Sequence, residues 1–141
     1  MHQYRHAIIL FVLSFVFAVR VAGQAVQRWF PQSFLPPFDA FQGSNLPYWL
    51  LLSIQICLLA MMFMMSWRIG RHTLLRRGRT GRLLAWTGGI YMFGSILRIL
   101  IGIAFPDAGV WFKAWIPAFF HLVLAGFILV IALYHLHPSE K

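Results

Sequence analysis

Four long apolar runs constrain the fold of this chain more than any other feature of its sequence. They cover residues 7–23, 48–67, 83–105 and 111–135. A helix needs roughly 20 apolar residues to cross the ~30 Å hydrocarbon layer of a bilayer. Inside that layer every backbone N–H and C=O group must find a partner within the segment, which an isolated run achieves only as a helix. The sequence therefore predicts an all-α integral membrane protein, with four transmembrane helices in a single four-helix domain over residues 1–141.

The charged residues agree with this fold class and exclude others. Only 11% of the residues are charged, and 12 Lys and Arg stand against 3 Asp and Glu. A small soluble domain needs a surface that mixes both signs of charge, which so few acids cannot supply. Cys57 is the only cysteine, which excludes a disulfide scaffold. The aromatic and apolar runs exclude an intrinsically disordered chain.

Arginine gathers in the connection between the second and third runs and predicts the orientation of the chain. By the positive-inside rule this connection lies in the cytoplasm, so both termini are expected there too, in a bacterial inner membrane. Because the connection lies between two spanning helices, we expect its arginines to attract anionic inner-leaflet lipids and not nucleic acid. These arginines are Arg68, Arg71, Arg76, Arg77, Arg79 and Arg82.

The first run has a competing interpretation, and the segment after it is unusual. Residues 1–25 resemble a secretory signal peptide, but Arg20 lies just before the possible cleavage site and argues against one. The following segment, residues 24–47, alternates Phe with Pro, and its prolines prevent a continuous helix. We expect this outer loop either to lie on the membrane interface and cap the bundle, or to pack its apolar residues on the helix ends as an ordinary loop.

Each predicted helix carries a hydrogen-bonding side chain in its outer half. Ionisable groups inside a membrane are costly and normally face protein, water or a ligand. Arg98 lies roughly 10 Å from the outer end of its helix, and no Asp or Glu lies within any of the four helices. Its counter-charge must then come from Asp39 or Asp107 in the outer loops, a lipid phosphate, a bound ligand or another subunit. The four side chains are Arg20, Gln55, Arg98 and His121.

Small and polar residues share helix faces with this set. In the third run, Tyr91 and Ser95 lie on the face of Arg98 at helical spacing, together with glycines that allow close helix contact. In the last run, alanines share a face with His121, and Pro117 predicts a local kink. The predicted ligand- or partner-binding site therefore consists of Arg20, Gln55, Tyr91, Ser95, Arg98 and His121. The alternative is that Arg98 and His121 hold the helices together and bind no ligand.

The histidines raise an alternative, a site for haem b. His121 and His135 share the alanine-rich face of the last run, as axial haem ligands do in four-helix cytochromes. A bis-histidine haem also needs a second histidine at the same depth on a facing helix. His121 has none, whereas His135 could pair with His6 or His72 on the inner side. The simpler interpretation is that these inner histidines lie at the level of the lipid head groups.

The sequence contains no recognisable catalytic set, such as a pair of intramembrane carboxylates, an HExxH motif or a nucleophile elbow. We therefore expect a small inner-membrane accessory or scaffold subunit of a larger membrane complex, without catalytic activity of its own. Its outer-half polar site would contact a partner, a lipid or a quinone-like ligand. The alternative function is an electron-transfer subunit that binds haem b or a quinone.

Overall fold

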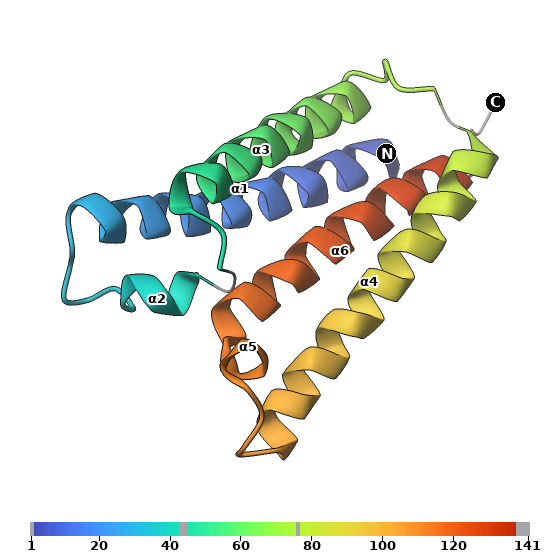
Figure 1. Ribbon diagram of the computed structural model, residues 1–141. Helices are drawn as coiled ribbons and strands as arrows, with labels where there is room; N and C mark the ends of the chain where they lie inside the picture. Colours follow the sequence, from blue (N-terminus) through green and yellow to red (C-terminus); the bar gives the residue numbers. More distant parts are fainter. Residues whose placement is uncertain (1, 43–44, 76, 138–141) are drawn as a thin grey trace.

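The computed structural model describes residues 2–42, 45–75 and 77–137, which form helices joined by short connections (Figure 1). Four of the helices are long and apolar enough to cross a membrane. This confirms the predicted fold class, an all-α protein with four candidate membrane spans. The long helices are α1 (His2–Trp29), α3 (Tyr48–Gly70), α4 (Gly78–Ala104) and α6 (Trp115–Leu136), and the one-turn helices are α2 (Phe38–Phe41) and α5 (Val110–Lys113).

Two helices are longer than the apolar runs that predicted them. α1 continues to Trp29 instead of ending near residue 23, and α4 begins at Gly78 instead of residue 83. Arg79 and Arg82 therefore belong to the first turns of α4 and not to the connection. Apolar residues mark only the part of a helix suited to hydrocarbon, whereas Arg and Gln are good helix formers and continue the helix beyond it.

The sequence predicted one helix over the last apolar run, but the structure divides this run into two helices. α5 ends at Lys113, Ala114 has φ −72° and ψ 78°, and α6 begins at Trp115. Pro117 has no N–H group to donate to the carbonyl of Lys113, so a regular helix cannot run through this point. The kink expected at Pro117 is thus a complete break. In a continuous helix the Trp111 carbonyl would accept the N–H of Trp115. The break leaves this carbonyl available to another donor.

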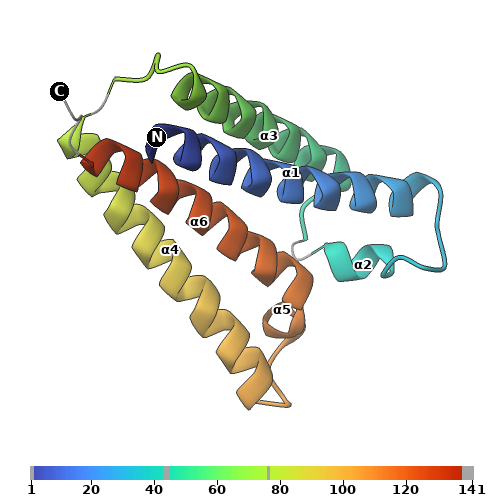
Figure 2. The same cartoon turned by 180° about the vertical axis from the view of Figure 1, so that it is seen from behind.

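The long helices lie side by side in the order α3, α1, α6, α4 (Figures 1 and 2). α1 packs on α3, α4 packs on α6, and contacts between α1 and α6 join the two pairs. We call the end where α3 stops and α4 starts the arginine-rich end, and the opposite end the α2–α5 end. The pairs diverge toward the α2–α5 end (Figure 1), so the domain is an opened bundle.

Glycines on α4 allow that helix to approach α6 and α5 closely. A Cβ atom added at Gly88 would lie 3.0 Å from side-chain atoms of Ile128 and Leu129. A Cβ at Gly102 would collide with the backbone carbonyl of Phe112 in α5. Within a bilayer, helices associate largely through such close packing of small residues, so this face fixes the α4–α6 pair and the position of α5.

The Phe- and Pro-rich connection contributes α2 to the fold. This short helix packs against both α1 and α6, and Phe41 is buried with 6% of its surface exposed. One edge of the Phe41 ring lies beside Gly23, where an added Cβ would be 3.8 Å away. α2 therefore lies between the two diverging pairs at the α2–α5 end.

His72 ends α3 in the left-handed conformation, with φ 57°. Its N–H donates to the Ile69 carbonyl at 3.1 Å, and the Thr73 N–H donates to the Arg68 carbonyl at 3.0 Å. This is the Schellman pattern, in which glycine is the preferred residue at the left-handed position. The ring of His72 also packs edge-to-face on Tyr4, with centres 5.4 Å apart.

The helix end at His72 can be tested with two substitutions that both remove the ring. We expect the His72→Gly protein to be more stable than the His72→Ala protein by about 1 kcal/mol, because only glycine adopts this conformation without cost. Reversible unfolding in mixed detergent micelles measures the difference. Equal stability of the two proteins would show that residue 72 is not left-handed.

The close approach of α4 to α5 gives a second prediction. Gly102→Ala should destabilise the protein by about 1–3 kcal/mol, because the α5 backbone must move to admit the methyl group. Gly94→Ala is the matched control on the same helix, since no described atom lies within 4 Å of its added Cβ. The control should be neutral or slightly stabilising because alanine favours the helix. Thermal unfolding of the two proteins that gave the same midpoint would contradict the packing of α5 described here.

Candidate functional site

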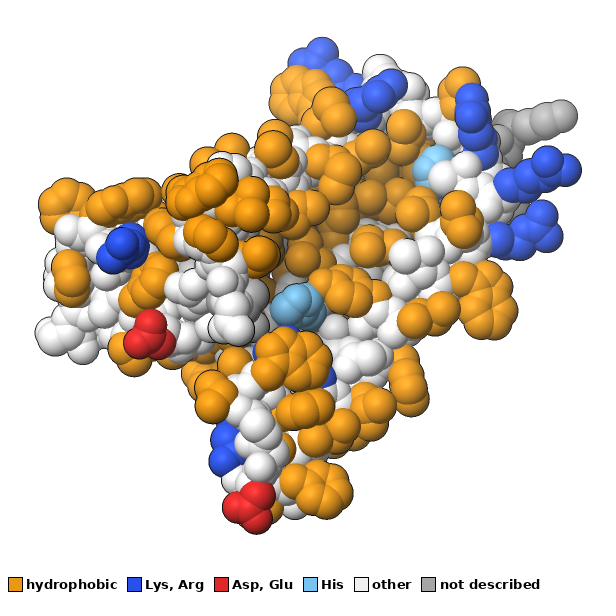
Figure 3. Space-filling view, in the orientation of Figure 1, with side chains coloured by type: hydrophobic (Ala, Val, Ile, Leu, Met, Phe, Trp, Pro, Cys, Tyr) orange, Lys and Arg blue, Asp and Glu red, His pale blue; other side chains and the backbone are white. Residues whose placement is uncertain are grey.

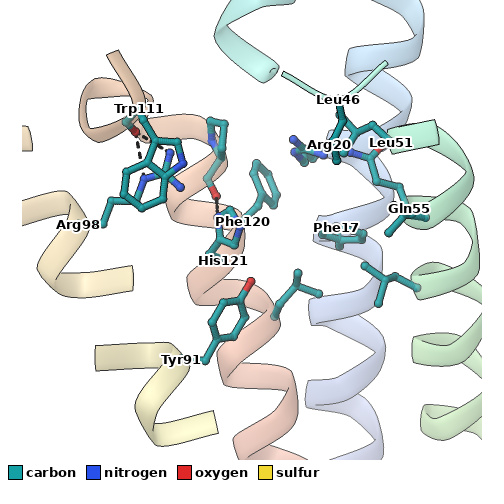
Figure 4. Close-up of a pocket in the computed structure, with 14 residues that line it drawn as sticks. Phe17, Arg20, Leu46, Leu51, Gln55, Tyr91, Arg98, Trp111, Phe120 and His121 are labelled. Carbon is teal, nitrogen blue, oxygen red and sulfur yellow. Dashed lines mark hydrogen bonds between the residues drawn. The ribbon is translucent and has the colours of Figure 1, made fainter. Parts of the chain in front are cut away.

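A cavity of about 340 Å³ lies between the two helix pairs, toward the α2–α5 end (Figure 4). All four long helices contribute to its lining. Every residue of the predicted binding site except Ser95 lines it: Arg20, Gln55, Tyr91, Arg98 and His121. Most of the remaining lining is apolar: Phe17, Leu46, Leu51, Ile54, Leu58, Trp111, Pro117, Phe120 and Leu124.

Arg98 reaches the cavity from α4 and is buried, with 5% of its surface exposed. Its Nε and Nη2 atoms donate to the Trp111 carbonyl at 3.1 and 2.6 Å, and its guanidinium carbon lies 3.8 Å from the centre of the Trp111 ring. In the described part of the chain it forms no salt bridge with Asp39 or Asp107. Its charge is therefore met by a carbonyl dipole and an aromatic face, and not by an anion.

Arg20 is held in a similar way from the opposite side of the cavity (Figure 4). Its Nη2 atom donates to the Phe41 carbonyl of α2 at 2.9 Å, and its guanidinium carbon lies 5.5 Å from the centre of the Phe120 ring. The Nε atom is buried without a hydrogen-bond partner. Since buried N–H groups are nearly always paired, this atom marks a place where a ligand oxygen would be stabilised.

A buried pair of glutamines adjoins Arg20, and the sequence had pointed to only one of them. Gln55 of α3 donates from Nε2 to Oε1 of Gln24 on α1, at 3.3 Å. The Gln55 Oε1 and Gln24 Nε2 atoms are buried without partners. Gln24 follows Arg20 by one helical turn, so the same face analysis that linked Tyr91 to Arg98 could have found it.

His121 and Tyr91 form the wall between the two arginines. The His121 Nδ1 atom lies 2.6 Å from the Pro117 carbonyl, so it donates its hydrogen there and leaves Nε2 as the acceptor of a neutral ring. The His121 ring meets Tyr91 edge-to-face with centres 5.7 Å apart. Ser95 differs from the prediction, because it is buried in the α4 packing face and its hydroxyl donates to the Tyr91 carbonyl at 2.8 Å.

The histidines of the alternative haem site lie among aromatic rings, and the His6 ring also packs on His137 with centres 5.7 Å apart. The His6 ring packs on Tyr134 with centres 6.3 Å apart, while His72 is the residue that ends α3 and packs on Tyr4.

His135 itself has a hydrogen bond that opposes haem ligation. Its Nδ1 atom accepts the backbone N–H of Arg77 at 3.1 Å, so in the neutral ring the hydrogen is on Nε2. A ligating histidine has the opposite arrangement, in which the nitrogen away from the metal donates its N–H to an acceptor. The geometry of His135 therefore does not fit an axial haem ligand.

The arginines predicted to act at the membrane surface occupy different environments. Arg71 stacks on Trp67, with its guanidinium carbon 4.4 Å from the ring centre, and Arg79 and Arg82 are exposed on α4. Arg68 and Arg77 line a second cavity at the arginine-rich end. Arg76 lies outside the described residues.

The chemistry of the cavity near the α2–α5 end is that of a binding site for oxygen-rich groups. Two guanidinium groups and a phenol supply donors, and the described lining contains no carboxylate or thiol. Acceptors are present at Gln55 and His121 for a ligand that also carries a hydroxyl group. Comparison with models of protein families, with curated proteins and with solved structures found no match to this chain.

Proposed function

We propose that the protein is a small accessory subunit of a membrane assembly, whose cavity near the α2–α5 end binds the oxygen-rich head group of a membrane-soluble amphiphile. A lipid phosphate and a quinone ring share this chemistry, since both present oxygen acceptors on an apolar tail. The proposal places the arginine-rich end in the cytoplasm, as the positive-inside rule favours, and the cavity in the opposite half of an inner membrane.

The observation that carries the proposal is a pair of buried arginines without an anionic partner. Arg20 and Arg98 line one cavity from different helix pairs, and the Nε atom of Arg20 has no partner. A guanidinium without an anionic partner at membrane depth costs several kcal/mol. A ligand oxygen placed beside either arginine would form charge-assisted hydrogen bonds, which are about twice as strong as neutral ones.

The shape of the cavity supports a ligand with an apolar tail. Apart from Tyr91 at the middle of α4, the polar groups lie toward the α2–α5 end, while Phe17, Leu58 and Leu124 line the part nearer the middle of the helices. Those helices are the candidate membrane spans, so the tail would continue into the hydrocarbon. A small hydrophilic anion would leave this apolar wall exposed and gain nothing from it.

Two features support an accessory role over an enzymatic one. The ionisable groups of the lining are two arginines, a tyrosine and a histidine, and the Nδ1 atom of that histidine is held by the Pro117 carbonyl. These groups can bind and orient a head group. The outward face of α4 also exposes large apolar residues, such as Ile90 (67%) and Phe93 (68%), which suit contact with neighbouring spanning helices.

The test replaces the arginine and measures binding of defined probes. The purified chain in detergent is titrated separately with a short-chain phosphatidylglycerol and a short-chain ubiquinone, and bound probe is counted by native mass spectrometry. We expect Arg98→Gln to weaken binding of the preferred probe about 10- to 100-fold, the effect of losing a hydrogen bond to a charged group. Arg28→Gln is the matched control, because Arg28 lies beside Phe38 and outside the cavity.

Comparison of the two probes shows whether the ligand is a phospholipid or a quinone. Saturable binding of phosphatidylglycerol that Arg98→Gln weakens identifies a lipid, and the same result with ubiquinone identifies a quinone. Equal weakening by Arg98→Gln and Arg28→Gln would show only a general effect of charge. That result, or no saturable binding of either probe to the unaltered chain, would refute the proposal.

A further inference from the structure

A second cavity, of about 530 Å³, lies at the arginine-rich end. Its lining comes from α3, α4, α6 and the connection of residues 71–77. Apolar side chains form most of it, among them Met61, Leu84, Phe127 and Ile131 of the spanning helices. Figure 3 shows apolar side chains around the hollow between α3 and α4, and Lys and Arg side chains gathered at the end beside it.

Hydrogen bonds from α6 hold the connection against this cavity. The Tyr134 hydroxyl donates to the Leu74 carbonyl at 2.8 Å, and the backbone N–H of Arg77 donates to His135 Nδ1 at 3.1 Å. Tyr134 and His135 are both buried. These bonds hold Leu74 and Arg77 against the cavity, with Arg77 at its edge.

The charge at this cavity is positive, and among the described residues it comes from only two of the arginines that gather at this end of the protein. Arg68, in the last turn of α3, and Arg77, just before α4, both line it, and the described lining contains no carboxylate. The first turn of α4 borders the cavity through Thr80 and has no side-chain hydrogen bond as a cap. The open N–H groups of a helix start favour an anion, so they add to the attraction of the two arginines.

We propose that this second cavity binds one anionic phospholipid from the leaflet at the arginine-rich end, with its phosphate between Arg68 and Arg77 and an acyl chain along Met61, Leu84 and Phe127. Charge complementarity selects the phosphate, and the apolar wall selects a molecule with a hydrocarbon chain. A free phosphate or a nucleotide would leave that wall without a partner. The site uses none of the residues of the cavity near the α2–α5 end, so it does not depend on the function proposed for that cavity.

The charge requirement is tested with two double substitutions that remove the same charge. Arg68→Gln with Arg77→Gln alters the lining of the cavity, whereas Arg79→Gln with Arg82→Gln alters exposed arginines nearby. Each full-length protein, in a zwitterionic detergent, is titrated with phosphatidylglycerol and with phosphatidylcholine of the same acyl chains, and bound lipid is counted by native mass spectrometry. We expect the first pair to lower phosphatidylglycerol affinity about tenfold or more and the second about twofold or less.

Two outcomes would overturn the proposal. Equal losses in the two double variants would mean that the arginines act only as a diffuse surface charge. Equal affinity of the unaltered chain for phosphatidylcholine and phosphatidylglycerol would mean that no anionic head group is recognised.

The acyl-chain wall is tested by a substitution that leaves the charge unchanged. Met61 lines the cavity and is 45% exposed, so Met61→Trp should fill its apolar part without disturbing the core. Met64→Trp is the control, because Met64 is 49% exposed on the same helix and lies outside the cavity. We expect only Met61→Trp to lower phosphatidylglycerol occupancy, and unchanged occupancy in that variant would exclude the cavity as the site.

A last experiment distinguishes failure of this inference from failure of the proposed function. The arginine pairs are also compared in an Arg98→Gln background, in which binding in the cavity near the α2–α5 end is weakened. Loss of the lipid with Arg68 and Arg77 in that background supports the second site, whatever the outcome of the probe titrations at the first. Lipid that disappears with Arg98→Gln alone, and is unaffected by the Arg68 and Arg77 changes, places the only lipid site in the other cavity and refutes the inference.

Discussion

Burial of Arg98 between spanning helices is the constraint on which the rest of the structure depends. A guanidinium there needs acceptors, yet each carbonyl inside a regular helix already accepts a backbone hydrogen bond. The chain supplies an acceptor by breaking the last run at Ala114, which frees the Trp111 carbonyl for Arg98. α2 supplies a similar acceptor for Arg20, which donates a hydrogen bond to the Phe41 carbonyl. The two short helices α2 and α5 thus stabilise the buried arginines by supplying their hydrogen-bond acceptors.

The sequence predicted the four spans because a run of about 20 apolar residues has few alternatives in a bilayer. It predicted the close packing face of α4 for a related reason, since glycines recur there at helical spacing. The sequence predicted an end of α1 that was too early and a start of α4 that was too late. Hydropathy marks the boundary of the hydrocarbon and not the end of the helix. The break before α6 was expected only as a kink, since a proline alone does not specify how far the chain turns aside.

Costly side chains in a membrane tend to face one another, which accounts for the way residues grouped from the sequence come together in the structure. Arg20, Gln55, Tyr91, Arg98 and His121 do line one cavity. What the sequence could not supply was the partner of each group. The acceptors of both arginines are backbone carbonyls, and carbonyls have no signature in a sequence. Gln24 was missed for a different reason, since an uncharged amide near a helix end did not stand out.

The same contacts that satisfy the arginines also keep the cavity open. α2 contacts both α1 and α6, and the large rings of Phe120 and Trp111 face the two guanidinium groups. Toward the arginine-rich end, the buried core of the described residues includes Leu10 of α1 and Tyr134 of α6, and the second cavity lies beside it between α3, α4 and α6. The short helices α2 and α5 therefore supply both the acceptors of the buried arginines and part of the packing around this cavity near the α2–α5 end, and an oxygen-rich head group is the ligand that we propose to meet that charge.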